Sequence, residues 1–174
     1  MPSRFGSAIL TCVVAGAVGF AGCSSDAGGT PTDAASQEAD FAQCADTPAV
    51  PYMPGVKVTS TSEAYVVTLI SAKTDFSDGS PSVDYATVGL DTWVLSVTNA
   101  ADGTPADMTM TAERPTMPRH GHGATTYPAV TPGDPGAFTM SGINFFQAGY
   151  WEQILNLMPA SAAADKAKFA ICIL

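Results

Sequence analysis

The stretch TWVLSVTN, residues 92–99, decides the fold class of this chain. Its large apolar residues Trp93, Leu95 and Val97 alternate with positions that hold Thr92, Ser96 and Thr98, with Val94 between the first two. Successive side chains of a β-strand point to opposite faces of a sheet, so a period of two predicts a strand with one buried face. We therefore expect residues 92–99 to form a half-buried strand.

Segments of similar character lie on both sides of this strand. Further strands are predicted over residues 64–72, 108–112, 138–146, 151–157 and 168–174. Turn signals separate them, notably Ala101-Asp102-Gly103 and TPGDPG at residues 131–136, and only residues 160–168 have the composition of a short helix. This spacing predicts an all-β domain, an immunoglobulin-like antiparallel β-sandwich of about seven to eight strands. A small barrel is the alternative.

The N-terminus has the organisation of an export signal. Arg4 precedes AILTCVVAGAVGF, residues 8–20, which carries no charge. This segment has about the length of a signal-peptide core and is too short to span a bilayer of about 30 Å as a helix. It ends in Phe20-Ala21-Gly22-Cys23, which resembles the bacterial lipobox. We expect residues 1–22 to be a lipoprotein signal peptide and Cys23 to carry the lipid. An ordinary secretory signal that happens to contain a cysteine is the alternative.

The segment after Cys23 is poor in large apolar residues. Residues 24–43 read SSDAGGTPTDAASQEADFAQ, and Phe41 is the one large apolar side chain among them. Such a segment buries too little apolar surface to offset its ordering entropy, so residues 23–43 are expected to form a flexible tether. The folded domain is then expected over residues 44–174. Ser24 after the acylated cysteine favours the outer membrane of a two-membrane cell, with the domain facing the periplasm or the exterior.

The charge balance restricts the partners. Sixteen acidic and seven basic residues give a formal net charge of −9 at pH 7. Nucleic acid and anionic membrane surfaces repel such a chain, so no nucleic-acid partner is expected and the lipid is the expected membrane anchor. The same charge attracts cations.

Two cysteines remain after the lipidated one. Cys44 stands at the start of the predicted domain and Cys172 close to the end of the chain. In an oxidising envelope such a pair usually forms a disulfide, which here would close nearly the whole domain. Two unpaired buried thiols are the alternative.

A series of short motifs occupies ERPTMPRHGHGATTYPAVTPGDPGAFTMSGINFFQAGYWEQILNL, residues 113–157. Met117-Pro118 precedes His120-Gly121-His122-Gly123, and a proline-valine strand over residues 128–130 follows. After a glycine-rich turn and an apolar strand comes GYWE, residues 149–152. In order and spacing these motifs resemble the YtkA-like (FixH-like) family of bacterial envelope domains, in particular its lipoproteins whose domain opens and closes with a cysteine.

The resemblance implies an immunoglobulin-like fold and an accessory role in the cell envelope, without enzyme activity. Some family members are linked to copper supply for respiratory oxidase assembly. One departure is Gln153, which stands where the family tends to place an inward apolar residue. A local change of register, such as a β-bulge, is therefore expected there.

The residues themselves offer candidate copper ligands. His120 and His122 are the only two histidines. In an extended segment they would share a face, and the glycines beside them free the backbone so that both imidazoles can reach one ion. Met117 adds a soft thioether, and imidazole with thioether suits copper better than calcium or magnesium. Zinc would need further ligands. The alternative is that the histidines are hydrogen-bonded or solvent-facing and the methionines belong to the core.

No constellation of catalytic residues is recognisable. The chain has no histidine outside this pair, no Gly-x-Ser-x-Gly elbow, no phosphate-binding glycine loop and no His-Glu-x-x-His. We do not expect an enzyme. Two functions stay open: a lipid-anchored accessory domain that handles copper, and a metal-free β-sandwich interaction module that docks an envelope or membrane protein.

Overall fold

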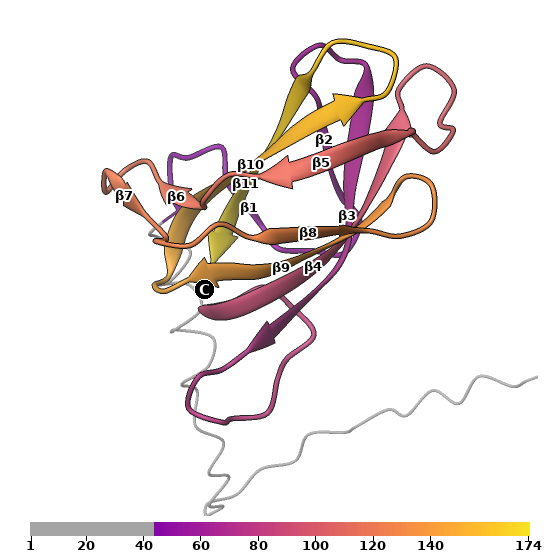
Figure 1. Cartoon of the computed structure of the whole chain (residues 1–174). Coiled ribbons are helices and arrows are strands. Elements are labelled where there is room, and N and C mark those ends of the chain that lie inside the picture. The colour runs from indigo at the N-terminus through magenta and orange to yellow at the C-terminus, as the bar shows by residue number, and fades with distance from the viewer. Residues whose placement is uncertain (1–43) are drawn as a thin grey trace, which may run out of the picture. The chain divides into compact units, whose positions relative to one another are not determined.

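Residues 44–174 are described by the computed structural model, in which they form eleven β-strands and no helix (Figure 1). The predicted signal peptide, the lipidation site Cys23 and the tether lie outside the described residues. Residues 44–174 contain no helix that is long and apolar enough to cross a membrane. The strands are β1 (Val50–Pro51), β2 (Val56–Thr59), β3 (Tyr65–Asp75), β4 (Gly89–Asn99), β5 (Met108–Ala112), β6 (Thr116–Met117), β7 (His122–Gly123), β8 (Ala129–Pro132), β9 (Ala137–Phe145), β10 (Gly149–Pro159) and β11 (Asp165–Ile173).

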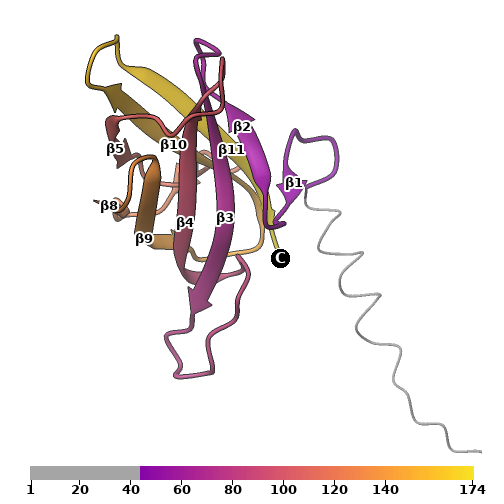
Figure 2. The same cartoon turned by 90° about the vertical axis from the view of Figure 1, so that its right-hand side faces the viewer.

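These strands form two sheets that pack face to face. One has the order β1-β11-β10-β6-β7, with β5 also paired to β10, and the other has the order β2-β3-β4-β9-β8. Figure 2 looks onto the second sheet, whose strands lie side by side in that order. Every pairing is antiparallel except the parallel contact of β1 with β11. The predicted β-sandwich is therefore confirmed.

The chain changes sheet between β1 and β2, between β4 and β5, between β7 and β8, and between β9 and β10. Strands β3, β4, β9 and β8 thus lie side by side in one sheet, and β5, β10 and β11 lie side by side in the other. The immunoglobulin-like assignment itself stays a prediction. The strand count exceeds the expected seven to eight because β1, β6 and β7 are two-residue pairings.

The alternating stretch lies at the centre of the molecule. It belongs to β4, whose Trp93, Leu95 and Val97 have no exposed surface. The Trp93 ring contacts Phe145 of β9 and Phe169 of β11, with ring centroids 5.9 and 5.6 Å apart. These tilted and edge-on contacts join residues of both sheets, so the aromatic side chains of the core hold the two layers together.

The expected helix over residues 160–168 is wrong. Strand β10 runs to Pro159, the chain turns, and β11 begins at Asp165. Ala167 pairs with Leu155 of β10 and is 2% exposed. The helix propensity of alanine is a weak local preference, and continuous pairing with β10 outweighs it. The two predicted turns do occur, after β4 and between β8 and β9.

The expected bulge at Gln153 lies on the neighbouring strand instead. Gln153 is 1% exposed, and the pairing of β10 with β11 passes through it without a shift. On the other side of β10, Leu155 pairs with Ala112 and Glu152 with Thr116, so the strand that continues from β5 into β6 carries one extra residue. The Gln153 amide donates to the Glu113 carbonyl oxygen at 2.8 Å. This buried amide therefore satisfies backbone that the interrupted pairing leaves unpaired.

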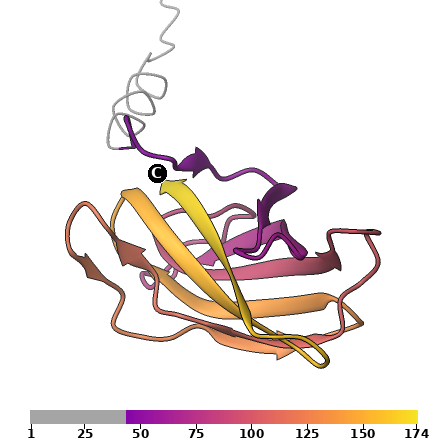
Figure 3. The ribbon, with the colours of Figure 1, turned by 90° about the horizontal axis from the view of Figure 1, so that it is seen from above.

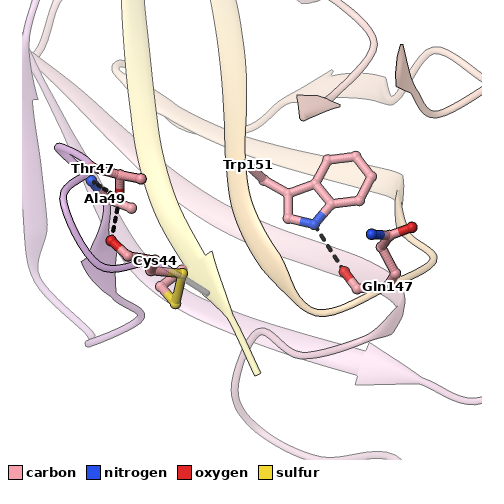
Figure 4. The surroundings of a disulfide bond; sticks show 6 residues. Cys44, Thr47, Ala49, Gln147 and Trp151 are labelled. Atoms are coloured by element: carbon pink, nitrogen blue, oxygen red, sulfur yellow. Dashed lines mark hydrogen bonds between the residues drawn. A yellow bond between two sulfur atoms is a disulfide. The ribbon is translucent and has the colours of Figure 1, made fainter. Parts of the chain in front are cut away.

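The cysteine pair joins the two ends of the described chain. The sulfur atoms of Cys44 and Cys172 are bonded, with Cα atoms 5.9 Å apart (Figure 4). Figure 3 shows the first strand running beside the end of β11, where Val50 pairs with Ile171. Both sheets, the core and the disulfide lie within residues 44–174, so we expect this segment to fold on its own.

Candidate metal site at the β6–β7 hairpin

The two histidines lie on a short hairpin at the edge of the first sheet. Met117 of β6 pairs with His122 of β7, and the Met117 carbonyl oxygen accepts hydrogen bonds from the amides of His120 and Gly121 at 3.0 and 3.1 Å. His120 is therefore in the turn and His122 in the returning strand. Sequence reasoning expected one extended segment, whereas a tight turn brings the two residues together.

The glycines of the His-Gly-His-Gly segment have separate roles. Gly121 has a φ of +68°, the left-handed conformation that lets the chain reverse between the histidines. A Cβ on Gly123 would stand 2.4 Å from the Pro115 carbonyl oxygen and 3.0 Å from the Thr116 Cα atom. Only glycine lets β7 approach β6 this closely. The segment is therefore built to hold the imidazoles in place.

Both imidazoles are exposed and adjacent. The ring centroids of His120 and His122 are 5.4 Å apart with an interplanar angle of 43°. Imidazole nitrogens that share one ion at about 2.0–2.1 Å each lie at most about 4 Å from one another. Because each nitrogen lies at the rim of its ring, small side-chain rotations would bring two nitrogens to such a separation. The pair can act as a two-imidazole site for a transition metal.

Met117 does not accompany the histidines to the surface. Its side chain has no exposed surface and belongs to the sandwich core. Met108 and Met110 of β5 are also buried. The expected three-residue ligand set is therefore not assembled in this structure, because Met117 would have to leave the core to join it. Within residues 44–174, no three histidine, cysteine, aspartate or glutamate side chains come close enough to hold a metal ion together.

The aromatic side chain of Phe146 packs against His122. The His122 ring lies against Phe146, with centroids 5.5 Å apart, and Phe146 meets the buried Trp151 ring edge-on at 5.2 Å. The Trp151 Nε1 atom donates to the Gln147 carbonyl oxygen at 2.9 Å (Figure 4). The histidine pair is thus coupled by ring contacts to a rigid tryptophan of the core.

Phe146 also lines an open cleft of about 620 Å³. Residues 75–78, 88–90 and 144–146 line it. Among its apolar lining residues Leu90 and Phe146 are 49% and 45% exposed, whereas Phe145 is buried. Sequence reasoning missed this cleft. Its residues come from the β3–β4 loop and the end of β9, and only the pairing of β4 with β9 brings them together.

A buried carboxyl group lies near this end of β4. Asp91 has no exposed surface, and its Oδ2 atom has no hydrogen-bond partner among the described residues. Burial raises the pKa of Asp91 to about 7, although hydrogen bonds from Thr74 and Thr87 act in the opposite direction. The signal was present in the sequence, because Asp91 precedes Trp93, Leu95 and Val97 at the same inward period.

Comparisons of the chain with protein-family models, with curated proteins and with solved structures found no match. The resemblance to the YtkA-like family therefore stays a prediction.

Proposed function

We propose that this chain is a lipid-anchored accessory domain of the bacterial cell envelope, a carrier that binds one copper ion through His120 and His122. The observation that carries the proposal is the exposed imidazole pair, with ring centroids 5.4 Å apart on a hairpin that two glycines shape. Among divalent first-row metals, copper binds nitrogen ligands most tightly. The net charge of −9 adds a favourable long-range attraction for a cation.

Two imidazoles leave coordination positions open on a bound ion. An ion held in this way can accept further ligands from water or from a second protein, which suits a domain that passes copper on. A structural site would instead be closed by four protein ligands. The anchor at Cys23 would keep the domain at the membrane, the place where an envelope partner would receive the ion.

The test is copper binding by residues 44–174 with an acetylated N-terminus, because a free amino group is itself a copper ligand. A chelator competition assay should give about one copper ion per chain. His120→Ala with His122→Ala should lower the affinity at least about tenfold, since loss of even a supporting partner of a ligand lowers metal affinity about 10–100-fold. Equal affinity of the wild type and the double variant would refute the site.

A metal-free interaction module is the second candidate function. The observation that favours it is the apolar lining of the cleft, where Leu90 and Phe146 are both about half exposed. Exposed apolar side chains around a concave surface are typical of binding sites.

A further inference from the structure

We propose that the cleft beside Phe146 docks a short segment of a partner protein in which an aromatic side chain is flanked by lysine or arginine. This inference deepens the second candidate function and does not rest on copper binding. It is carried by the shape, the apolar lining and the charge of the cleft.

The apolar lining of the cleft suits an aromatic side chain. The accessible apolar surface comes from Phe76, Val88, Leu90 and Phe146. Its volume of about 620 Å³ falls in the range of natural ligand sites, about 300–1,000 Å³. The half-exposed ring of Phe146 can meet an incoming ring edge-on or by offset stacking, the two arrangements that aromatic pairs prefer.

The charged side chains of the cleft are all acidic. Asp75 and Asp78 line it, and none of its lining residues is basic. Asp75 forms an ion pair with Lys73, whose Nζ atom lies 3.1 Å from the Asp75 carboxylate. Asp78 forms no ion pair among the described residues. A cation that enters the cleft therefore meets the Asp78 carboxylate beside the aromatic rings of Phe76 and Phe146, and aromatic faces attract cations as well.

The loop geometry keeps Asp78 charged. The Ser80 amide donates to the Asp78 Oδ1 atom at 2.9 Å, and this hydrogen bond holds the pKa of Asp78 below its usual range. The carboxylate is thus ionised at neutral pH. An acidic or uncharged segment of the same apolar content would lack this attraction, so charge selects the partner.

Three capped tripeptides with the same central phenylalanine test the inference: acetyl-Lys-Phe-Lys-amide, acetyl-Gln-Phe-Gln-amide and acetyl-Glu-Phe-Glu-amide. Each is titrated into residues 44–174 at neutral pH with a metal chelator present, and amide chemical shifts are followed by NMR. The lysine peptide should bind about three- to fivefold more tightly than the glutamine peptide, as expected for exposed cation–π and ionic contacts. Its shift changes should centre on Asp78, Leu90 and Phe146. Equal binding of the lysine and glutamine peptides, or shift changes centred elsewhere, would overturn the proposal.

Two matched variants separate the cleft from the overall negative charge. Asp78→Asn should lower the affinity for the lysine peptide about threefold. Asp102→Asn is its control, because Asp102 accepts the Thr104 amide at 2.9 Å in an equivalent turn outside the cleft. Phe146→Ala should weaken binding, whereas Tyr127→Ala, which removes a 68% exposed ring outside the cleft, should not. Equal effects of the two aspartate variants would show attraction to net charge alone and would overturn the proposal. Copper binding by the same variants is measured separately, so the copper site and the cleft can fail independently.

Discussion

Replacement of Asp91 by asparagine should stabilise the protein at neutral and alkaline pH. The side chain of Asp91 has no exposed surface, and burial raises its pKa from 3.8 to about 7. Between these two values the folded protein holds a proton on Asp91 that the unfolded chain releases. The free energy of unfolding contributed by this group therefore falls as the pH rises from about 4 to about 7 and is level above that range.

The hydrogen bonds around Asp91 agree with a protonated carboxyl group. The Thr74 hydroxyl group donates to the Tyr85 carbonyl oxygen at 2.7 Å, and the Thr87 amide donates to the Thr74 Oγ1 atom at 3.2 Å. The same Oγ1 atom is also hydrogen-bonded to the Asp91 Oδ1 atom. A hydroxyl group has only one proton to give. While the Thr74 hydroxyl group donates to the Tyr85 carbonyl oxygen, a protonated Asp91 can supply the proton of the Asp91–Thr74 hydrogen bond.

The size of the effect follows from the pKa. One pH unit of pKa difference corresponds to about 1.4 kcal/mol, so a change from 3.8 to about 7 corresponds to at most about 4 kcal/mol. Asparagine keeps the shape of aspartate and carries no charge. Asp91→Asn should thus change stability little at pH 4 and should raise the free energy of unfolding by up to about 4 kcal/mol at pH 8.

Urea unfolding of the wild type and the variant at several pH values between 4 and 8 measures this difference. The other carboxylates contribute equally to the pH dependence of stability in both proteins, so their contributions cancel in the comparison. Asp84→Asn is the control, because it removes the same charge from an exposed position of the β3–β4 loop and should stay within about 0.5 kcal/mol of the wild type. A difference for Asp91→Asn that does not grow with pH, or a variant less stable than the wild type at pH 8, would refute the reasoning.

Three further predictions concern the anchor, the disulfide and the core methionine. Cys23→Ser should leave an unmodified precursor, and a variant that still partitions into detergent with the mass increase of the acylated protein would contradict the lipobox interpretation. Purified protein should lack two hydrogens by intact mass and yield a Cys44–Cys172 peptide, and replacing both cysteines by alanine should lower stability by about 4–5 kcal/mol in urea, as chain entropy estimates for so long a loop. Met117→Leu conserves volume in the core, so it should leave copper affinity unchanged and lower stability by less than about 1.5 kcal/mol, whereas a marked loss of copper(I) affinity in the competition assay would show that Met117 reaches the ion.

Several features of the fold followed from local sequence. The period of two over residues 92–99 predicted a half-buried strand because side-chain direction alternates along any strand, whatever lies beside it. The segment over residues 108–112 was placed at its observed bounds for the same reason. The turn at residues 131–136 was readable because proline and glycine restrict or free the backbone locally.

Other features could not be predicted because they depend on residues far apart in the chain. Residues 160–168 resemble a helix by composition, and only pairing with β10 makes residues 165–168 a strand. Gln153 suggested a bulge in its own strand. The extra residue instead lies in the neighbouring strand, about forty residues earlier in the sequence. A local pattern contains no information about which strand lies alongside.

Some features of the candidate sites could also be predicted from the sequence, and others required the tertiary structure. The sequence by itself placed His120 and His122 near each other, because they are two positions apart, but it predicted an extended segment where the structure has a tight turn. Only the tertiary structure decided that Met117 points into the core and that Phe146 contacts His122 and also lines a cleft. The burial of a side chain depends on how one sheet packs on the other. The local sequence around a residue does not show which distant residues cover it.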